Sequence, residues 1–318
     1  MTVQSDDLEG FLAELEREVR AAGDPAAGIF GPRSMMWRVS RESITFLGGG
    51  RAALLQLAHP WVATAVQQHS RSESDLPGRF QRTFNHVFAL VFGDLDAALA
   101  SARRVHALHA TVTGHLEEAL GPWPREHRYE ANDEAALLWV QATLVDTSVL
   151  MYETFIGPLS DADKEALWQD NRRFARLFGI SDATLPPTWA AFRNYFDATV
   201  ASDLLTVGAA SRRMAHFLLT PPNTLVTPAW RWYAALTTGF LPERLRPALG
   251  FAWGRSQRLV FGATLAALKV SWRRLPSRLR WLPAYVDARR RLRGEARDPL
   301  GLVAERLVLG ALRQERRA

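Results

Sequence analysis

The chain has 318 residues, of which 47% are hydrophobic and 23% are charged, with a formal net charge of +6. This length and apolar content allow a substantial buried core in one or two domains. The absence of cysteine excludes a disulfide framework, an iron–sulfur cluster and a cysteine nucleophile.

The amino-terminal part predicts an acidic helical extension over residues 1–28. Residues 1–23 have no apolar centre and therefore do not form a secretory signal. No run of about 18 uncharged apolar residues is present, because the most apolar segment, 135–152, contains Asp146. We therefore expect a soluble, cytoplasmic protein. The acidic residues are Asp6, Asp7, Glu9, Glu14, Glu16 and Glu18.

Helical periodicity dominates the remainder, and strand-like alternation is scarce. No linker, low-complexity run or repeat divides the chain. We therefore expect an all-α protein with one large multi-helix domain at 29–295 and a C-terminal helix at 296–318. The predicted helices are 43–58, 79–92, 95–119, 134–155, 161–177, 188–218 and 228–238.

Two features near residue 50 bear on function. Gly48-Gly49-Gly50-Arg51 lacks the Lys-Ser/Thr of a phosphate loop and lies in a helical pattern, so close helix packing explains it better. His59 precedes Pro60, which ends or bends the helix there. His59 is therefore either a hydrogen-bonding residue at a helix end or part of a cofactor-pocket wall.

The helix at 79–92 carries an arginine and a threonine next to each other. Its periodicity turns Thr83 toward the core and places Arg82 on the flank, so a hydroxyl and a guanidinium could reach one small ligand. The alternative is a helix-start arginine and a threonine bonded to its own backbone. The expected inward stripe is Phe80, Thr83, Phe84, Val87, Phe88 and Val91.

The helix at 95–119 points a histidine inward. His109 shares the apolar face, and a buried imidazole requires either a hydrogen-bond partner or a metal. His106 and His109 could form half of a metal site, but the Glu-x-x-His pairs of a di-iron centre do not occur. Asp146 is expected to pair with a histidine or arginine, with a structural ion pair favoured. The apolar face comprises Leu95, Leu99, Ala102, Val105, His109, Val112 and Leu116.

A basic stretch follows near the carboxy terminus. It is either a solvated helix surface or a patch for an anionic partner. Trp272, Trp281 and Tyr285 lie among the arginines, which favours an anionic membrane surface over nucleic acid. The arginines are Arg273, Arg274, Arg278, Arg280, Arg289, Arg290, Arg291 and Arg293.

Several motifs follow one another along the chain: Gly49-Gly50-Arg51 through His59-Pro60, His69-Ser70, Gly78-Arg79-Phe80-Gln81-Arg82-Thr83, Arg103 through Gly114, Tyr129-Glu130-Ala131-Asn132-Asp133, Trp139 through Thr143, Leu241-Pro242 and Pro283 through Arg289. Their order and spacing, over roughly residues 30–295, resemble those of the MpaB-type oxygenases and latex clearing proteins.

This resemblance implies an all-helical domain with a globin-like core that binds haem b. It assigns His109 as the proximal iron ligand. His106 and Thr113 stand where the family has flanking arginines, and His59 is a further candidate for the haem pocket.

The family's Arg-x-x-Lys-Thr group maps onto Arg79, Arg82 and Thr83, with arginine in place of lysine. The resemblance implies that these catalytic candidates lie beside the open face of the haem, where their donors stabilise negative charge on dioxygen. The carboxylate base of rubber cleavage has no counterpart, because the region near Ala63 is apolar.

The resemblance therefore implies a haem-dependent oxygenase that acts with dioxygen on an apolar, unsaturated, lipid-like substrate. Peripheral contact with an anionic membrane and no binding of nucleic acid are also expected. Two alternatives remain open. One is a haem-binding or gas-sensing protein without turnover. The other is a helical scaffold without haem, in which His109 is only a core histidine.

Overall fold

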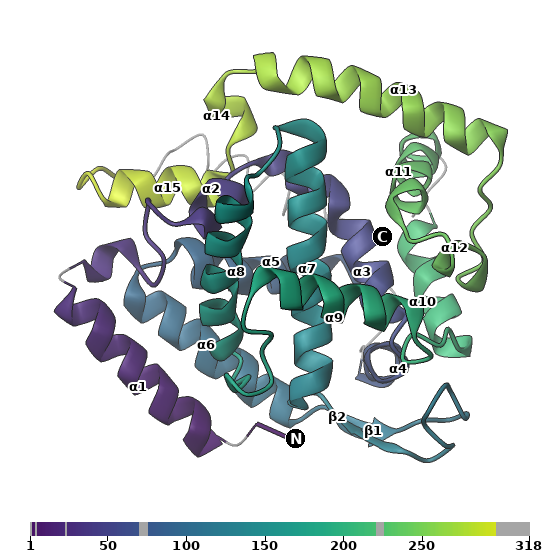
Figure 1. The fold of residues 1–318 in the computed structure, drawn as a ribbon, viewed down its shortest axis with the longest axis horizontal. Coiled ribbons are helices and arrows are strands. Elements are labelled where there is room, and N and C mark those ends of the chain that lie inside the picture. The colour runs from purple at the N-terminus through teal and green to yellow at the C-terminus, as the bar shows by residue number, and fades with distance from the viewer. Residues whose placement is uncertain (1, 4, 23, 70–75, 221–225, 297–318) are drawn as a thin grey trace, which may run out of the picture.

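The computed structural model describes residues 2–3, 5–22, 24–69, 76–220 and 226–296, without the side chains at 5, 76–82 and 84. The described part is mostly helical, with one two-stranded hairpin, which confirms the all-α prediction (Figure 1). The C-terminal helix expected at 296–318 lies outside the described residues, apart from Ala296. The helices are α1 (Ser5–Ala21), α2 (Met35–Ser40), α3 (Gly49–Leu57), α4 (Pro60–His69), α5 (Leu76–Phe92), α6 (Leu95–Ala110), α7 (Glu134–Phe155), α8 (Asp161–Arg176), α9 (Trp189–Ala201), α10 (Ala209–Leu219), α11 (Thr227–Phe240), α12 (Leu245–Ala248), α13 (Arg255–Ser271), α14 (Ser277–Arg280) and α15 (Pro283–Arg291).

The central helix is α7, which has the bounds that the sequence predicts. Its N-cap is Asp133, whose carboxylate accepts hydrogen bonds from the amides of Ala135 and Ala136, both at 3.0 Å. Among the described helices, α7 alone is long and apolar enough to cross a membrane. However, 72% of that apolar window is buried inside the protein, and other helices surround α7 on several sides (Figure 1). It therefore has the surroundings of a core helix.

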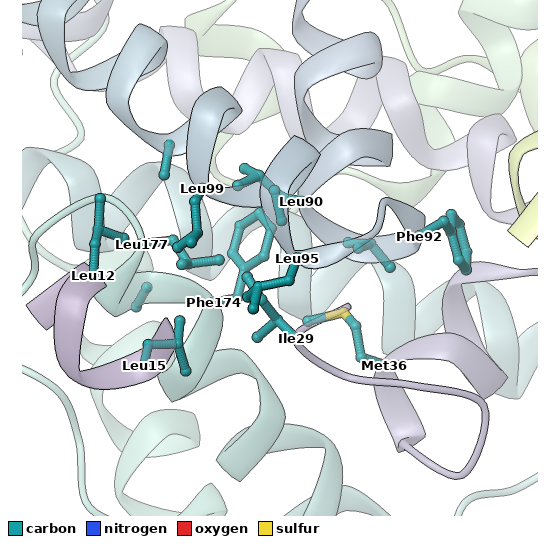
Figure 2. Packing of buried hydrophobic residues seen from close by; sticks show 14 of the residues in the cluster. Leu12, Leu15, Ile29, Met36, Leu90, Phe92, Leu95, Leu99, Phe174 and Leu177 are labelled. Atoms are coloured by element: carbon teal, nitrogen blue, oxygen red, sulfur yellow. The ribbon is translucent and has the colours of Figure 1, made fainter. Parts of the chain in front are cut away.

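The acidic extension is part of the main core. Helix α1 buries Leu12 and Leu15 in the same cluster as Leu99 of α6 and Leu177, which follows α8 (Figure 2). Its outer face carries the carboxylates, one of which accepts from Arg103 at 3.0 Å. The domain boundary at residue 28 stays a prediction, and α1 contributes buried residues to the same core as the helices that follow.

The predicted helix at 95–119 is wrong beyond Ala110. Thr111 ends α6, and the chain then forms strand β1 (Thr113–His115), which pairs with β2 (Arg128–Glu130). The strands are antiparallel, with Thr113 opposite Glu130 and Gly114 opposite Tyr129. Helix propensity is poor in a run of β-branched residues followed by glycine, and the hairpin satisfies their backbone groups instead.

The predicted helix at 188–218 is also interrupted. Helix α9 ends at Ala201, and α10 begins only at Ala209, after a turn that contains Ser202 and Gly208. By contrast, α8 begins with the predicted capping box, in which Ser160 and Asp163 bond reciprocally.

The basic C-terminal stretch is partly built into the fold. Tyr285 is buried, and Trp281 packs edge-on against it at 5.2 Å between ring centroids. Arg291 donates to the carbonyls of Ala26 and Phe92, and Arg280 pairs with Glu42 at 3.0 Å. The prediction that these aromatic residues present an interfacial face is therefore wrong for Tyr285 and Trp281, because both pack against the core.

Candidate cofactor site

The end of α6 and the β-hairpin enclose a cavity, and His109, the predicted iron ligand, lies on its wall. Its volume is about 260 Å³, and it is partly open to solvent. Three of the four residues assigned to cofactor binding, His106, His109 and Thr113, lie on its wall together. The lining residues are Thr2, Val3, His106, His109, Ala110, Thr113, Glu130 and Asn132.

Both histidines of α6 face this cavity because residues three apart lie on the same side of a helix. His106 is 7% exposed and His109 is half-buried. The apolar periodicity of the sequence predicts only His109 on the inward face, and the burial of His106 does not follow from it. Burial lowers the pKa of His106, and the carboxylate of Glu9 partly opposes that shift. A lowered pKa favours the neutral imidazole, which is the form that binds a metal.

The hairpin and the amino terminus form the opposite wall. The side-chain amide of Asn132 donates to the backbone carbonyl of His106 at 3.3 Å. The backbone carbonyl of Asn132 accepts from the amide of Val3 at 2.9 Å. Thr2 donates to Glu130 Oε2 at 2.9 Å. Glu130 and Asn132 were not predicted as site residues, although both lie within one of the motifs that carry the family resemblance.

Helix α5 runs beside α6 in the opposite direction, because only Gly93 and Asp94 join the two helices. His86 Nδ1 lies 2.9 Å from Ser101 Oγ, which sets their register. The first half of α5 is therefore next to the last half of α6, where His109 lies. Arg79 and Arg82 belong to this half of α5, and their side chains lie outside the described part of the structure.

Thr83 has an exposed side chain, so the prediction that it faces the core is wrong. It shares the angular position of Val87, but the core contacts of α5 among the described side chains begin at Val87, one turn later. The apolar stripe of α5 thus keeps its helical period beyond the part of the helix that contacts the core. The catalytic assignments of Arg79, Arg82 and Thr83 stay predictions.

His59 lies apart from the residues that line the cavity. It is buried at the junction of α3 and α4, with ring centroids 5.0 Å from Trp123 and 5.9 Å from Trp61. Its Nδ1 has no hydrogen-bond partner within the described residues. Burial lowers the pKa of His59 to about 4, so the ring is neutral at pH 7.

Asp146 forms the structural ion pair that the sequence predicts. Its Oδ2 lies 2.5 Å from Arg51 Nη2, and its Oδ1 accepts from Arg193. Arg51 also donates to Thr147 Oγ1 at 2.5 Å and to the carbonyl of Phe240 at 2.9 Å. These mutual pairings hold α3, α7 and α9 together in the interior.

The cavity wall carries the type of ligand that a haem iron takes, an imidazole. Within the described ranges, no three His, Cys, Asp or Glu side chains gather where they could hold a metal ion. A haem supplies four ring nitrogens of its own, and one axial imidazole is sufficient to bind its iron. A histidine on the wall of a partly buried cavity satisfies that requirement.

Residues 37–272 match the family described as "ER-bound oxygenase mpaB/B'/Rubber oxygenase, catalytic domain". The chain belongs to this family. The MpaB/rubber oxygenase region runs from α2 to the end of α13 and contains α5, α6 and the hairpin. It therefore includes both histidines of the cavity, whereas α1 and α15 lie outside it.

Two curated relatives are similar to part of the chain. One is an uncharacterized protein of Mycobacterium bovis, and the other is an uncharacterized protein of Mycobacterium tuberculosis. Each is 30% identical over 162 residues, which represent 49% of this chain and 62% of the relative. No solved structure matches the chain significantly.

Proposed function

We propose that this member of the MpaB/rubber oxygenase family is a haem b-dependent oxygenase that uses dioxygen to oxidise an apolar, unsaturated substrate. The observation that carries the proposal is the shared cavity of His106, His109 and Thr113. By the resemblance, these residues stand at the positions of the family's ligand motif, and six of the eight residues that line the cavity lie in the matched region.

His109 is the proposed iron ligand, and His106 lies beside it on the same wall of the cavity. His106 is held in place because Asn132 binds its carbonyl and because its own side chain is buried. When bound, a haem would supply the redox chemistry for the reaction with dioxygen. The protein would supply orientation and electrostatics, including positive charge from Arg79 and Arg82 at the same end of the α5–α6 pair.

The proposal requires that the cavity become larger when haem binds. Cofactor sites commonly measure about 300–1,000 Å³, and the cavity bounded by the described residues measures about 260 Å³. Thr2 and Val3 form one wall: they are bonded to Glu130 and Asn132, and the side chain of Val3 is also buried in the main hydrophobic cluster. We propose that this short segment moves outward when haem binds.

The second candidate function is haem binding without turnover. The observation that favours it is the apolar environment of Ala63, which is fully buried where the rubber-cleaving relatives would carry a base. Glu130 is the carboxylate that lines the cavity. Loss of oxygen consumption with unsaturated hydrocarbons in Glu130→Gln, with haem content unchanged, would support the oxygenase.

Haem titration of the purified protein tests the cofactor assignment. We expect one haem per chain and a loss of affinity of at least tenfold in His109→Ala, because the metal ligand is removed. The loss in His106→Ala should be smaller. His115→Ala is the matched control, since His115 is exposed on the adjacent strand and does not line the cavity.

Circular dichroism must show that each variant is folded, because truncation of a buried histidine also leaves a cavity. A folded His109→Ala protein with full haem content and an unchanged Soret band would refute the assignment. If His106→Ala alone abolishes binding, the ligand is the histidine one turn earlier.

A further inference from the structure

Helix α13 lies along the edge of the molecule and buries none of its residues completely (Figure 1). One side packs on α11 and on the end of α7. Phe261 contacts Phe240 at 5.0 Å between ring centroids, and Trp232 donates to Thr264 at 2.8 Å. Leu265 and Leu268 pack against the buried cluster of Met151 and Phe155. These contacts fix which side of α13 faces outward.

The outward side of α13 is apolar. Leu259 is 74% exposed and Val270 is 55% exposed, and they lie on the same face eleven residues apart. A side chain added at Gly262 would meet no atom within 4 Å, so nothing in the described structure covers this face. We call this surface the outer face of α13. Its residues are Leu259, Val260, Gly262, Ala263, Ala266, Ala267 and Val270, all of which are exposed.

The surroundings of the outer face are strongly basic. Between Glu243 and Asp287 the chain has no acidic residue, but it has eight arginines and one lysine. Arg255, Arg258 and Lys269 lie along α13 beside the apolar residues of the outer face, and all three are exposed. Beyond its end, Leu279 is 63% exposed between Arg278 and Arg280. Exposed apolar and cationic side chains therefore alternate along one edge of the protein.

We propose that the outer face of α13 binds the surface of an anionic phospholipid bilayer, with its apolar residues in the headgroup region and its basic rim on lipid phosphates. This combination is the one that places a helix in a membrane interface. A second copy of the chain fits less well, because pairing two outer faces would bring two acid-free basic rims together. The inference is independent of the proposed function, since α13 and the cavity lie at opposite ends of α7.

Co-sedimentation with vesicles tests this surface. The full-length protein should bind vesicles of phosphatidylcholine with one quarter phosphatidylglycerol, bind pure phosphatidylcholine poorly, and dissociate as salt rises from 50 to 500 mM. Three neutralised charges should weaken binding on the order of 100-fold, because each contributes roughly fivefold. The charge variant is Arg255→Gln with Arg258→Gln and Lys269→Gln.

Two matched controls carry the same kinds of substitution at exposed positions away from α13. Neutralising three exposed arginines at the other end of the protein, Arg104, Arg125 and Arg128, should change binding much less. For the apolar contribution, Leu259→Ser with Val270→Ser should weaken binding, whereas Leu108→Ser, which is also exposed, should not.

Equal binding to neutral and anionic vesicles, or equal loss in the charge variant and its control, would overturn the proposal. So would a dimer in light scattering that Leu259→Ser with Val270→Ser dissociates, because the occupant would then be a second copy. If that double variant lowers the melting temperature by several degrees, another part of the chain covers the outer face and the proposal also fails.

Discussion

His59 is a histidine that the fold keeps uncharged. Its ring is buried beside Trp61 and Trp123, and its pKa is lowered from 6.5 to about 4, mainly by burial and with some opposition from Asp133. The unfolded chain takes up a proton as pH falls below 6.5, whereas the folded chain does not until about pH 4. Its contribution to stability is therefore complete above pH 6.5 and is lost as pH falls toward 4.

The expected effect of this histidine is about 3 kcal/mol between pH 7 and pH 4. Replacement of His59 by phenylalanine should remove this part of the pH dependence, because no proton can bind. Urea unfolding of wild type and His59→Phe at several pH values measures it, with His115→Phe as an exposed control. Parallel stability curves for wild type and His59→Phe would contradict the prediction.

Asp146 is the carboxylate that two arginines share. Removal of its charge leaves Arg51 buried without its main counter-ion, and breaking such pairs typically costs about 3–5 kcal/mol. We expect Asp146→Asn to lower the free energy of unfolding by this amount. Asp197→Asn also removes a partner of Arg193, but at an exposed position where about 0–1 kcal/mol is expected. Equal effects in urea denaturation would show that the interior network is not special.

At this scale the sequence predicts chemistry better than burial. The ion pair predicted for Asp146 is confirmed, whereas the roles predicted for His109 and the arginine motif stay predictions. The sequence misplaces Thr83 and overlooks the burial of His106, because exposure depends on where a helix leaves the core. The point at which a helix leaves the core depends on neighbouring elements that are distant in the sequence.

Close approach of helices accounts for the glycines before Arg51, as the sequence analysis inferred. The amide of Gly50 donates to the hydroxyl of Tyr233 at 2.8 Å, and a Cβ at this position would come within 2.6 Å of Thr237 Oγ1. Gly50→Ala should therefore destabilise the protein by about 1–3 kcal/mol.

Gly262 offers a matched control within a helix. A Cβ at Gly262 meets no atom within 4 Å, so Gly262→Ala should stabilise the protein by up to about 1 kcal/mol through helix propensity. Thermal unfolding of both variants gives the comparison. A neutral Gly50→Ala would mean that α3 and α11 are not in close contact in solution.

The elements were predicted with uneven success for physical reasons. Helix α7 was predicted at its bounds because Asp133 caps it and its composition is uniform. The hairpin was missed because Val112 and Leu116 continue the apolar period of α6 after the helix has ended. Helix α13 was not predicted, although it is as long as α5.

For the whole molecule, α7 sets the distance between the two surfaces of interest. It begins at Glu134, next to the cavity residue Asn132, and ends at Phe155, in the cluster that α13 covers. Twenty-two residues at 1.5 Å each span about 33 Å. A bilayer bound at the outer face of α13 would therefore lie about 30 Å from the cavity, with the acidic helix α1 also away from the lipid (Figure 1).

The attachment of Thr2 and Val3 to the cavity wall offers a position for a spectroscopic reporter. The chain has no cysteine, so a cysteine introduced at position 2 would be its single thiol and would accept one fluorophore without competing labelling. That fluorophore would lie at the edge of the cavity, where a bound haem would quench it by energy transfer. Occupancy could then be followed in real time, separately from turnover, in solution or on a vesicle.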